Sequence, residues 1–204
     1  MTSFQTGLHI AFGPMFAAKT NWLLQQLTTY ADVGYKVCLI NHADDIRKTE
    51  GSDRNVTTHS SQFKHLSHKI TPFKTDSLRK VYMDEFDVIG IDEGQFFDGK
   101  DNGIPEIVTV VRDLIMKKKK LVFISSLDGD FRAQTFGYVH QLICICDPGG
   151  LHKFSAICNK CRDNKKLSRA GFTGKILPSK DGEVKDVGGA DKYIALCLDC
   201  YRSS

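Results

Sequence analysis

The sequence predicts an α/β protein in which a mainly parallel sheet is flanked by helices and followed by a small C-terminal lobe. Over about the first 150 residues, short apolar runs alternate with segments of helical apolar spacing, which is typical of parallel sheets covered on both faces. After that point the chain changes to short extended pieces, glycines and cysteine pairs. Hydrophobic residues make up 41% and charged residues 25% of the 204 residues, which excludes a disordered chain, a collagen-like repeat and a coiled coil.

Apolar runs and helical periodicity place the expected elements in order along the chain. Each expected strand is a short apolar run, and each expected helix repeats apolar residues every three to four positions. The polar segment from Asn41 to about His65 has little periodicity, so we expect a long loop there, of a length that is usually functional. The expected strands cover residues 8–12, 36–40, 88–91 and 121–125, and the expected helices cover residues 20–30 and 104–116.

Length and charge limit the organisation and the partners of the chain. We expect one α/β domain over residues 1–150 and a lobe over residues 151–204, which is too short for an independent core. The net charge of +4 does not indicate a nucleic-acid partner. No apolar run approaches the roughly 20 residues that span a bilayer, and the N-terminal run lacks the features of a signal peptide. These observations predict a cytoplasmic protein without a membrane segment.

A candidate phosphate-binding loop follows the first expected strand and reads Gly13-Pro14-Met15-Phe16-Ala17-Ala18-Lys19-Thr20. Its template is Gly-x-x-x-x-Gly-Lys-Ser/Thr between a strand and a helix, and Ala18 replaces the second glycine. In such a loop, backbone N–H groups at a helix N-terminus point at phosphate oxygens. Lys19 would reach the β- and γ-phosphates, and Thr20 would bind Mg²⁺. The alternative is that Lys19 only begins a helix.

Two carboxylates end the third expected strand. The apolar run up to Ile91 leads directly into Asp92 and Glu93. In a protein with a phosphate loop, an acidic residue at this place holds Mg²⁺ directly or through water, which predicts that role for Asp92. Consecutive strand residues point to opposite faces, so Glu93 is a separate candidate, for the base that accepts a proton from a substrate hydroxyl. The alternative is a solvated strand end.

Four of the seven cysteines form two Cys-x-x-Cys pairs near the C-terminus. Four thiolates satisfy tetrahedral zinc with no open position, so this pattern predicts a structural rather than a catalytic zinc site. The segment 162–196 between the pairs is long enough to include a loop that covers a substrate. The alternatives are a redox dithiol or unrelated thiols. The candidate ligands are Cys158, Cys161, Cys197 and Cys200, and we expect Cys38, Cys144 and Cys146 to be core thiols.

Several more specific motifs occur in order along the chain. They are the segments 13–16 (GPMF), 92–97 (DEGQFF), 127–131 (LDGDF), 136–137 (FG) and 188–193 (GGADKY), together with the two cysteine pairs. With these motifs the chain closely resembles the type II thymidine kinases, the zinc-containing cytosolic, poxviral and bacterial enzymes. The resemblance extends from about Leu8 to Tyr201, which is nearly the whole chain.

The resemblance implies a P-loop α/β domain, a zinc lobe with a loop that covers the nucleoside, and transfer of the ATP γ-phosphoryl to the 5′-hydroxyl of thymidine or deoxyuridine. It also implies a homotetramer that thymidine triphosphate inhibits. Glu93 would be the base, and the donor site would include residues 13–20, Asp92 and Arg47. The residues that match the nucleoside site are Met15, Phe96, Leu127, Phe131, Phe136, Ser168, Val184, Val187, Gly188 and Tyr193.

The chain departs from the family pattern at two places. Ala17-Ala18 replaces the Ser-Gly or Ala-Gly that is typical of the loop, and Asp186 stands where the family usually has an apolar residue. These departures leave open a second hypothesis, a degenerate and catalytically silent copy with a structural or regulatory role. A third hypothesis, a zinc-ribbon protein that binds nucleic acid, would require a basic and aromatic face on the lobe, and residues 151–204 contain few aromatics.

Overall fold

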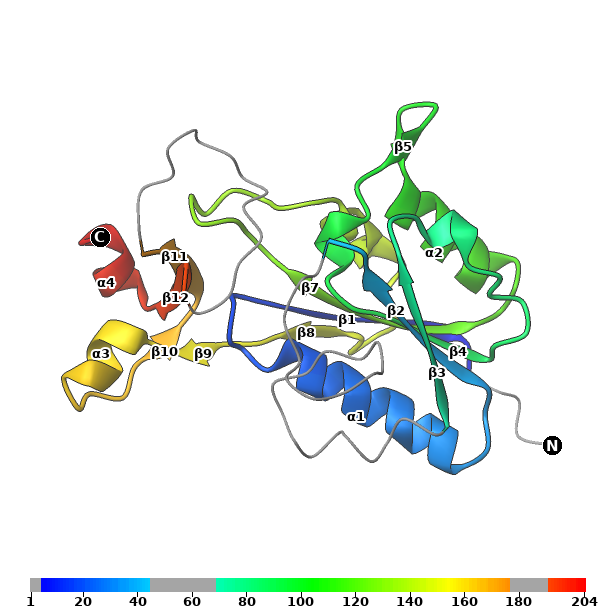
Figure 1. Cartoon of the computed structure of the whole chain (residues 1–204), viewed down its shortest axis with the longest axis horizontal. Coiled ribbons are helices and arrows are strands. Elements are labelled where there is room, and N and C mark those ends of the chain that lie inside the picture. Colours follow the sequence, from blue (N-terminus) through cyan, green and yellow to red (C-terminus); the bar gives the residue numbers. More distant parts are fainter. Residues whose placement is uncertain (1–4, 45–68, 177–190) are drawn as a thin grey trace.

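The computed structural model describes residues 5–44, 69–176 and 191–204 (Figure 1). Six strands form a parallel sheet in the order β3-β2-β4-β7-β1-β8. The parallel sheet expected from the sequence is therefore confirmed. Its strands are β1 (Gly7–Gly13), β2 (Val37–His42), β3 (Ile70–Thr75), β4 (Val88–Ile91), β7 (Leu121–Leu127) and β8 (Leu151–Lys153).

The other elements are two long helices and several short pieces. Helix α2 begins two residues later than expected, because Ile104 and Pro105 pair with the preceding strand instead of entering the helix. The helices are α1 (Lys19–Asp32), α2 (Glu106–Met116), α3 (Asn159–Asp163) and α4 (Leu198–Arg202), and the 3₁₀ turns are η2 (Leu78–Lys80), η3 (Gly94–Phe96) and η4 (Val139–Ile145). The short strands are β5 (Lys100–Asp101), β6 (Ile104–Pro105), β9 (Ala156–Ile157), β10 (Arg169–Ala170), β11 (Phe172–Lys175) and β12 (Tyr193–Leu196).

The central strands are buried on both faces, with α1 on one face of the sheet and α2 on the other (Figure 1). In β4, Val88 belongs to the apolar cluster of α1, whereas Ile89 and Ile91 belong to the cluster of α2. A Cβ atom on Gly90 would lie 2.4 Å from Cδ1 of Leu27. The absence of a side chain at Gly90 thus allows α1 to pack closely against the middle of the sheet.

The C-terminal lobe consists of two antiparallel strand pairs, β9 with β10 and β11 with β12, and of helices α3 and α4. It lies beyond the end of the sheet where β1 leads into α1 (Figure 1). Strand β8 adds residues 151–153 to the main sheet, and the division of the chain at residue 150 stays a prediction. Among the described residues the longest helix is α1 with 14 residues, and no described helix has the length and apolar character to cross a bilayer.

Three cysteines outside the pairs were expected in the core, and this expectation is wrong for one of them. Cys38 is fully buried, and burial raises the pKa of its thiol to about 12. Cys146 is half-buried, and burial raises its pKa to about 11. Cys144 is exposed. In turn η4 the buried side chains are those of Val139 and Leu142, so the apolar surroundings of Cys144 in the sequence do not place it inside.

Candidate active site

The loop between β1 and α1 has two non-glycine residues in the left-handed region. Phe16 has a φ of 64°, and Ala18, which precedes the first residue of α1, has a φ of 59° and a ψ of 26°. The side chain of Lys19 is buried, and its Nζ donates a hydrogen bond of 2.9 Å to the carbonyl oxygen of Pro14. The lysine thus folds back over its own loop. Strained backbone of this kind is concentrated at functional sites.

Replacing Ala18 with glycine is expected to stabilise the fold by about 0.5–1 kcal/mol. The left-handed conformation costs a residue with a Cβ about 1–2 kcal/mol, and the greater freedom of glycine in the unfolded chain cancels part of this gain. Nucleotide binding is expected to tighten because a methyl group leaves the loop. Urea unfolding and ATP titration measure the two effects.

Ala17→Gly is a control, because this change is expected to alter the stability in the opposite direction. Ala17 is 4% exposed and packs in the apolar cluster of the lobe, so Ala17→Gly is expected to lower the stability by about 1 kcal/mol. Equal destabilisation by Ala17→Gly and Ala18→Gly would contradict the strain assigned to Ala18.

Asp92 lies at the carboxyl end of β4, where the hydroxyl groups of two other elements meet it. The Thr20 Oγ1 atom, in the first turn of α1, lies 3.1 Å from each of the two carboxylate oxygens of Asp92. The Ser125 hydroxyl on β7 also donates to Asp92. Asp92 is 1% exposed, so these contacts lie in a buried oxygen-lined site. A carboxylate and a hydroxyl are the hard oxygen ligands that Mg²⁺ prefers.

Glu93 directly precedes the turn η3 and lies in the left-handed region, with a φ of 51° and a ψ of 46°. Its carboxylate accepts a hydrogen bond of 2.6 Å from Nε2 of Gln95. Asp92 and Glu93 lie just beyond the end of β4, so the alternation of strand residues does not apply to them, and the hydrogen bonds described for them go to different residues.

The expected pocket residues fall into two groups of contacts, and the first group lies at this turn. Phe96 of η3 packs edge-to-face on Phe136 with ring centres 5.7 Å apart. The Leu127 N–H at the end of β7 binds the same turn through Gln95. The lobe supplies a second group, in which Lys175 lies 5.1 Å from the ring of Phe131.

Strands β11 and β12 hold the remaining described candidates. Tyr193 is buried and pairs with Lys175 across the two strands, and Lys175 lies 5.9 Å from its ring. The backbone N–H of Met15 donates to Oγ1 of Thr173 at 3.0 Å, so the phosphate loop is joined to β11. Ser168 is half-buried, and its carbonyl oxygen accepts a hydrogen bond from the N–H of Cys158.

Four expected site residues, Arg47, Val184, Val187 and Gly188, lie outside the described residues, as does Asp186. Four other residues enter the site without having been singled out from the sequence: Gln95, Ser125, Ser126 and Thr173. Gln95 lies within the DEGQFF motif, and the two serines end an apolar run, which is a visible signal of polar groups placed at a strand end. Thr173 had no such signal, because only the pairing of β11 with β12 brings it to the loop.

The four paired cysteines converge in the lobe. Their sulfur atoms all lie within 4.8 Å of one another, and Cys161 Sγ is 3.8 Å from Cys197 Sγ and 3.7 Å from Cys200 Sγ. A tetrahedral zinc ion with bonds of about 2.3 Å requires sulfur separations of about 3.8 Å, so the cluster fits zinc. Burial raises the pKa of the Cys158 thiol, but hydrogen bonds from backbone N–H groups and with the neighbouring thiols lower it, whereas hydrogen bonds with Cys197 and Cys161 raise the pKa of the Cys200 thiol to about 12.

The cysteine cluster shares its apolar core with the phosphate loop. Ala17 packs with Ala156, Cys158, Cys161, Ala170, Ala195 and Leu196. The hydroxyl of Tyr201 in α4 also donates to the carbonyl oxygen of Phe131 at 2.9 Å. The lobe is therefore joined both to the phosphate loop and to the segment that carries a pocket residue.

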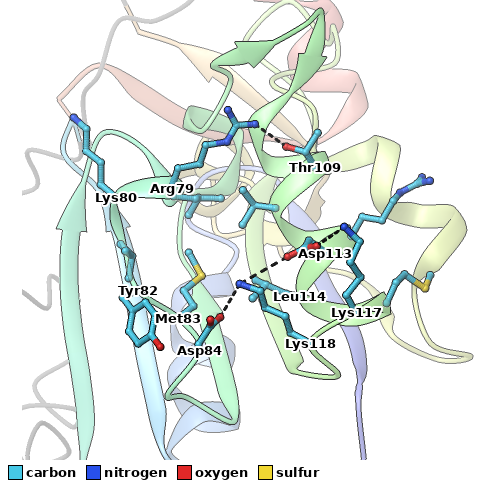
Figure 2. A pocket seen from close by; sticks show the side chains of 15 residues that line it. Arg79, Lys80, Tyr82, Met83, Asp84, Thr109, Asp113, Leu114, Lys117 and Lys118 are labelled. Atoms are coloured by element: carbon cyan, nitrogen blue, oxygen red, sulfur yellow. Dashed lines mark hydrogen bonds and ion pairs between the residues drawn. The ribbon is translucent and has the colours of Figure 1, made fainter.

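A separate cavity of about 840 Å³ lies between the segment 78–84 and helix α2 (Figure 2). Two of the cationic side chains that line it bind other lining residues: Arg79 donates to Thr109 at 3.2 Å, and Lys118 pairs with Asp84 at 2.6 Å. Of the expected site residues that the structure describes, none lines this cavity. It is thus distinct from the candidate site at the carboxyl ends of β1, β4 and β7.

A strand, a phosphate-type loop, a helix and a buried acidic strand end in a parallel sheet define the P-loop class of α/β proteins. The thymidine kinase family model matches residues 6–201, and the chain belongs to this family. Its members are kinases, which transfer phosphoryl groups. The resemblance stated from the sequence motifs is therefore confirmed.

Curated relatives match over nearly the whole chain. Thymidine kinase 1 of Dictyostelium discoideum is 32% identical over 100% of this chain and 81% of its own length. The thymidine kinase of Fowlpox virus (strain NVSL) is 32% identical over 97% of each chain, and that of Rabbit fibroma virus (strain Kasza) is 32% identical over 98% of this chain and 99% of its own. Among solved structures, AMPPCP-bound DnaA from Aquifex aeolicus aligns over 77% of this chain and 43% of that chain, with 16% identity and a TM-score of 0.38.

Proposed function

We propose that the chain is an active thymidine kinase, which transfers the γ-phosphoryl group of ATP to the 5′-hydroxyl of thymidine or deoxyuridine in pyrimidine deoxynucleotide salvage. Family membership supports the reaction class. The observation that carries the proposal is the contact between Thr20 and Asp92 at 3.1 Å, with Glu93 at the next position. This contact supports a magnesium site formed by Thr20 and Asp92, with the proposed base as the next residue of the chain.

In this proposal each charged group has a separate task. The N–H groups of residues 13–20 bind the donor phosphates, and Lys19 exchanges its bond to Pro14 for a phosphate oxygen. Thr20 and Asp92 would hold Mg²⁺, which when bound neutralises charge on the β- and γ-phosphates. The site is buried, and a low local dielectric strengthens these interactions.

The transfer itself requires one proton acceptor. The 5′-oxygen forms a bond to the γ-phosphorus, the bond from that phosphorus to the bridging oxygen of ADP breaks, and the hydroxyl proton passes to the Glu93 carboxylate. Phosphoryl transfer depends mainly on positioning and electrostatic stabilisation, so a base held by a hydrogen bond suits this step.

The aromatic and apolar side chains would form the nucleoside site. Phe96 and Phe136 are in contact, and Phe131 and Tyr193 both contact Lys175. We assign the base site to this set with Met15 and Leu127. On the resemblance alone, we add Ser168, Val184, Val187 and Gly188 to it and Arg47 to the donor site, together with a homotetramer, inhibition by thymidine triphosphate and a cytoplasmic location.

The second candidate function is a catalytically silent copy, and the observation that favours it is Ala18. The left-handed conformation of Ala18 shows that the loop keeps its turn without glycine, at a cost in strain. The proposal of an active kinase predicts that this strain weakens donor binding without abolishing it.

An assay of the purified chain with ATP, Mg²⁺ and thymidine tests the proposal. We expect formation of ADP and thymidine monophosphate in equal amounts, with a turnover on the order of 1 s⁻¹ or more. Chromatography of the nucleotides measures both products. Binding of pyrimidine nucleosides with no transfer to any of them would overturn the proposal and support the silent copy.

A further inference from the structure

Gln95 lies in the turn after Glu93 and is fully buried. Its amide joins two elements that are distant in the sequence. The Oε1 atom accepts hydrogen bonds from the Leu127 N–H at 3.0 Å and from the Ser126 hydroxyl at 3.1 Å. The Nε2 atom donates to Oε2 of Glu93 at 2.6 Å. One side chain therefore connects the end of β7 to the proposed base.

The orientation of this amide follows from its partners. A backbone N–H is only a donor, so the atom that faces Leu127 is the amide oxygen. An ionised carboxylate is only an acceptor, so the amide nitrogen faces Glu93. Reversing the amide would place two donors together at Leu127 and two acceptors together at Glu93. The hydrogen bonds thus allow only one orientation of the amide.

The residues around Gln95 pack closely against it and exclude water from its hydrogen bonds. Gly137 has a φ of 69°, and a Cβ atom there would lie 2.5 Å from the carbonyl oxygen of Gln95. Only a residue without a side chain lets the segment that carries Phe136 approach the turn so closely. Because no part of Gln95 is exposed, water does not compete for its hydrogen bonds.

We propose that Gln95 is a positioning residue that holds the carboxylate of Glu93 in the orientation needed to accept the proton of the substrate hydroxyl. The inference rests on the proposed function, in which Glu93 is the base. Glu93 lies in a turn with strained backbone and would otherwise depend on its own flexible side chain for its orientation. Ser126 is the second link, because it supports the amide oxygen of Gln95. Its neighbour Ser125 contacts Asp92, so the end of β7 orients both carboxylates.

The first test is Gln95→Glu, which keeps an acceptor for Leu127 and Ser126 but replaces the amide donor to Glu93 with a second carboxyl group, so that the two carboxyl groups repel each other or share a proton. We expect kcat to fall about 10- to 100-fold, which is the cost of a misplaced catalytic group, while KM for ATP and thymidine changes less than about twofold. Gln95→Met, which removes both functions of the amide, is expected to lower kcat at least as much. The control is Gln141→Met, a change at an exposed glutamine of η4, which is expected to leave kcat and KM unchanged.

The second test separates positioning from a general structural role. In a Glu93→Gln background, where the base is absent, Gln95→Met is expected to cause no further fall in kcat. If the falls in kcat caused by Glu93→Gln and by Gln95→Met multiply in the double variant, Gln95 has a general structural role and the inference is overturned. The same conclusion holds if Gln95→Glu raises KM as much as it lowers kcat. If either Gln95 variant fails to fold, Ser126→Ala is the deciding test. This change removes the hydroxyl that donates to Gln95 and keeps the hydrogen bond from the Leu127 N–H to Gln95. We expect kcat to fall, but by less than in Glu93→Gln.

The two proposals fail in different ways. Wild-type turnover by Glu93→Gln would overturn the assignment of the base and with it this inference. A large loss in Glu93→Gln with wild-type kcat in both Gln95→Glu and Ser126→Ala would overturn the positioning role alone.

Discussion

Replacing Glu93 with glutamine is expected to lower kcat for phosphoryl transfer by about 10²- to 10⁴-fold, with little change in the affinity for thymidine. Glutamine has nearly the same size as glutamate but does not accept the 5′-hydroxyl proton. The proximity of Asp92 does not compensate, because that carboxylate is engaged by Thr20 and Ser125. Single-turnover kinetics with ATP and Mg²⁺ measures the chemical step, and equilibrium titration measures nucleoside binding.

A matched control for this variant is Glu85→Gln. Glu85 is exposed on the segment before β4, so the same chemical change there is expected to leave kcat unaffected. Turnover by Glu93→Gln equal to that of Glu85→Gln would show that another group accepts the proton. A parallel loss of thymidine binding in Glu93→Gln would show that Glu93 acts mainly in binding.

Removing the metal, or one of its ligands, is expected to have the largest effect on stability. Purified protein is expected to contain about one zinc ion per chain, and Cys197→Ser is expected to lose it and to be destabilised by more than about 4 kcal/mol. The lobe has only a small apolar core of its own, and the metal would hold its two cysteine turns together. Metal analysis and thermal unfolding measure these effects.

Loss of zinc in Cys197→Ser is also expected to affect the phosphate loop. Ala17 packs in the core around the cysteines, and the Met15 N–H binds Thr173 of the lobe, so loss of zinc is expected to weaken ATP binding as well. Cys144→Ser is the control, because Cys144 is exposed and outside the cluster. A Cys197→Ser protein with full zinc content, or with unchanged stability, would contradict the structural zinc site. Unchanged ATP affinity after zinc loss would contradict the coupling to the loop.

The sheet was predictable where its strands are buried on both faces. Strand β4 was predicted with the correct bounds, because such a strand is a continuous apolar run that ends in charged residues. Strands β3 and β8, at the two edges of the sheet, were not predicted. Strand β3 contains Pro72 and Lys74, which an edge strand tolerates and which weaken its sequence signal.

The candidate site was predictable where its chemistry depends on neighbours in the sequence. The octet at residues 13–20, the Asp92-Glu93 pair and the cysteine spacing each describe a local geometry, and their order along the chain indicated the family that the comparison confirms. The expectation for Cys144 was wrong, because apolar neighbours in a 3₁₀ turn do not specify which side of the turn faces the core.

By itself, then, the sequence determined the fold class and the family, and it predicted the candidate phosphate loop and the four cysteines that the structure brings together, all of which follow from short-range spacing. The tertiary structure decided which residues contact Asp92 and Gln95. Strand β7 lies between β1 and β4, so Ser125 meets Asp92 and Ser126 meets Gln95 across more than thirty residues of chain. Such contacts depend on strand order and register, which arise from packing of the whole sheet, and no local pattern encodes them.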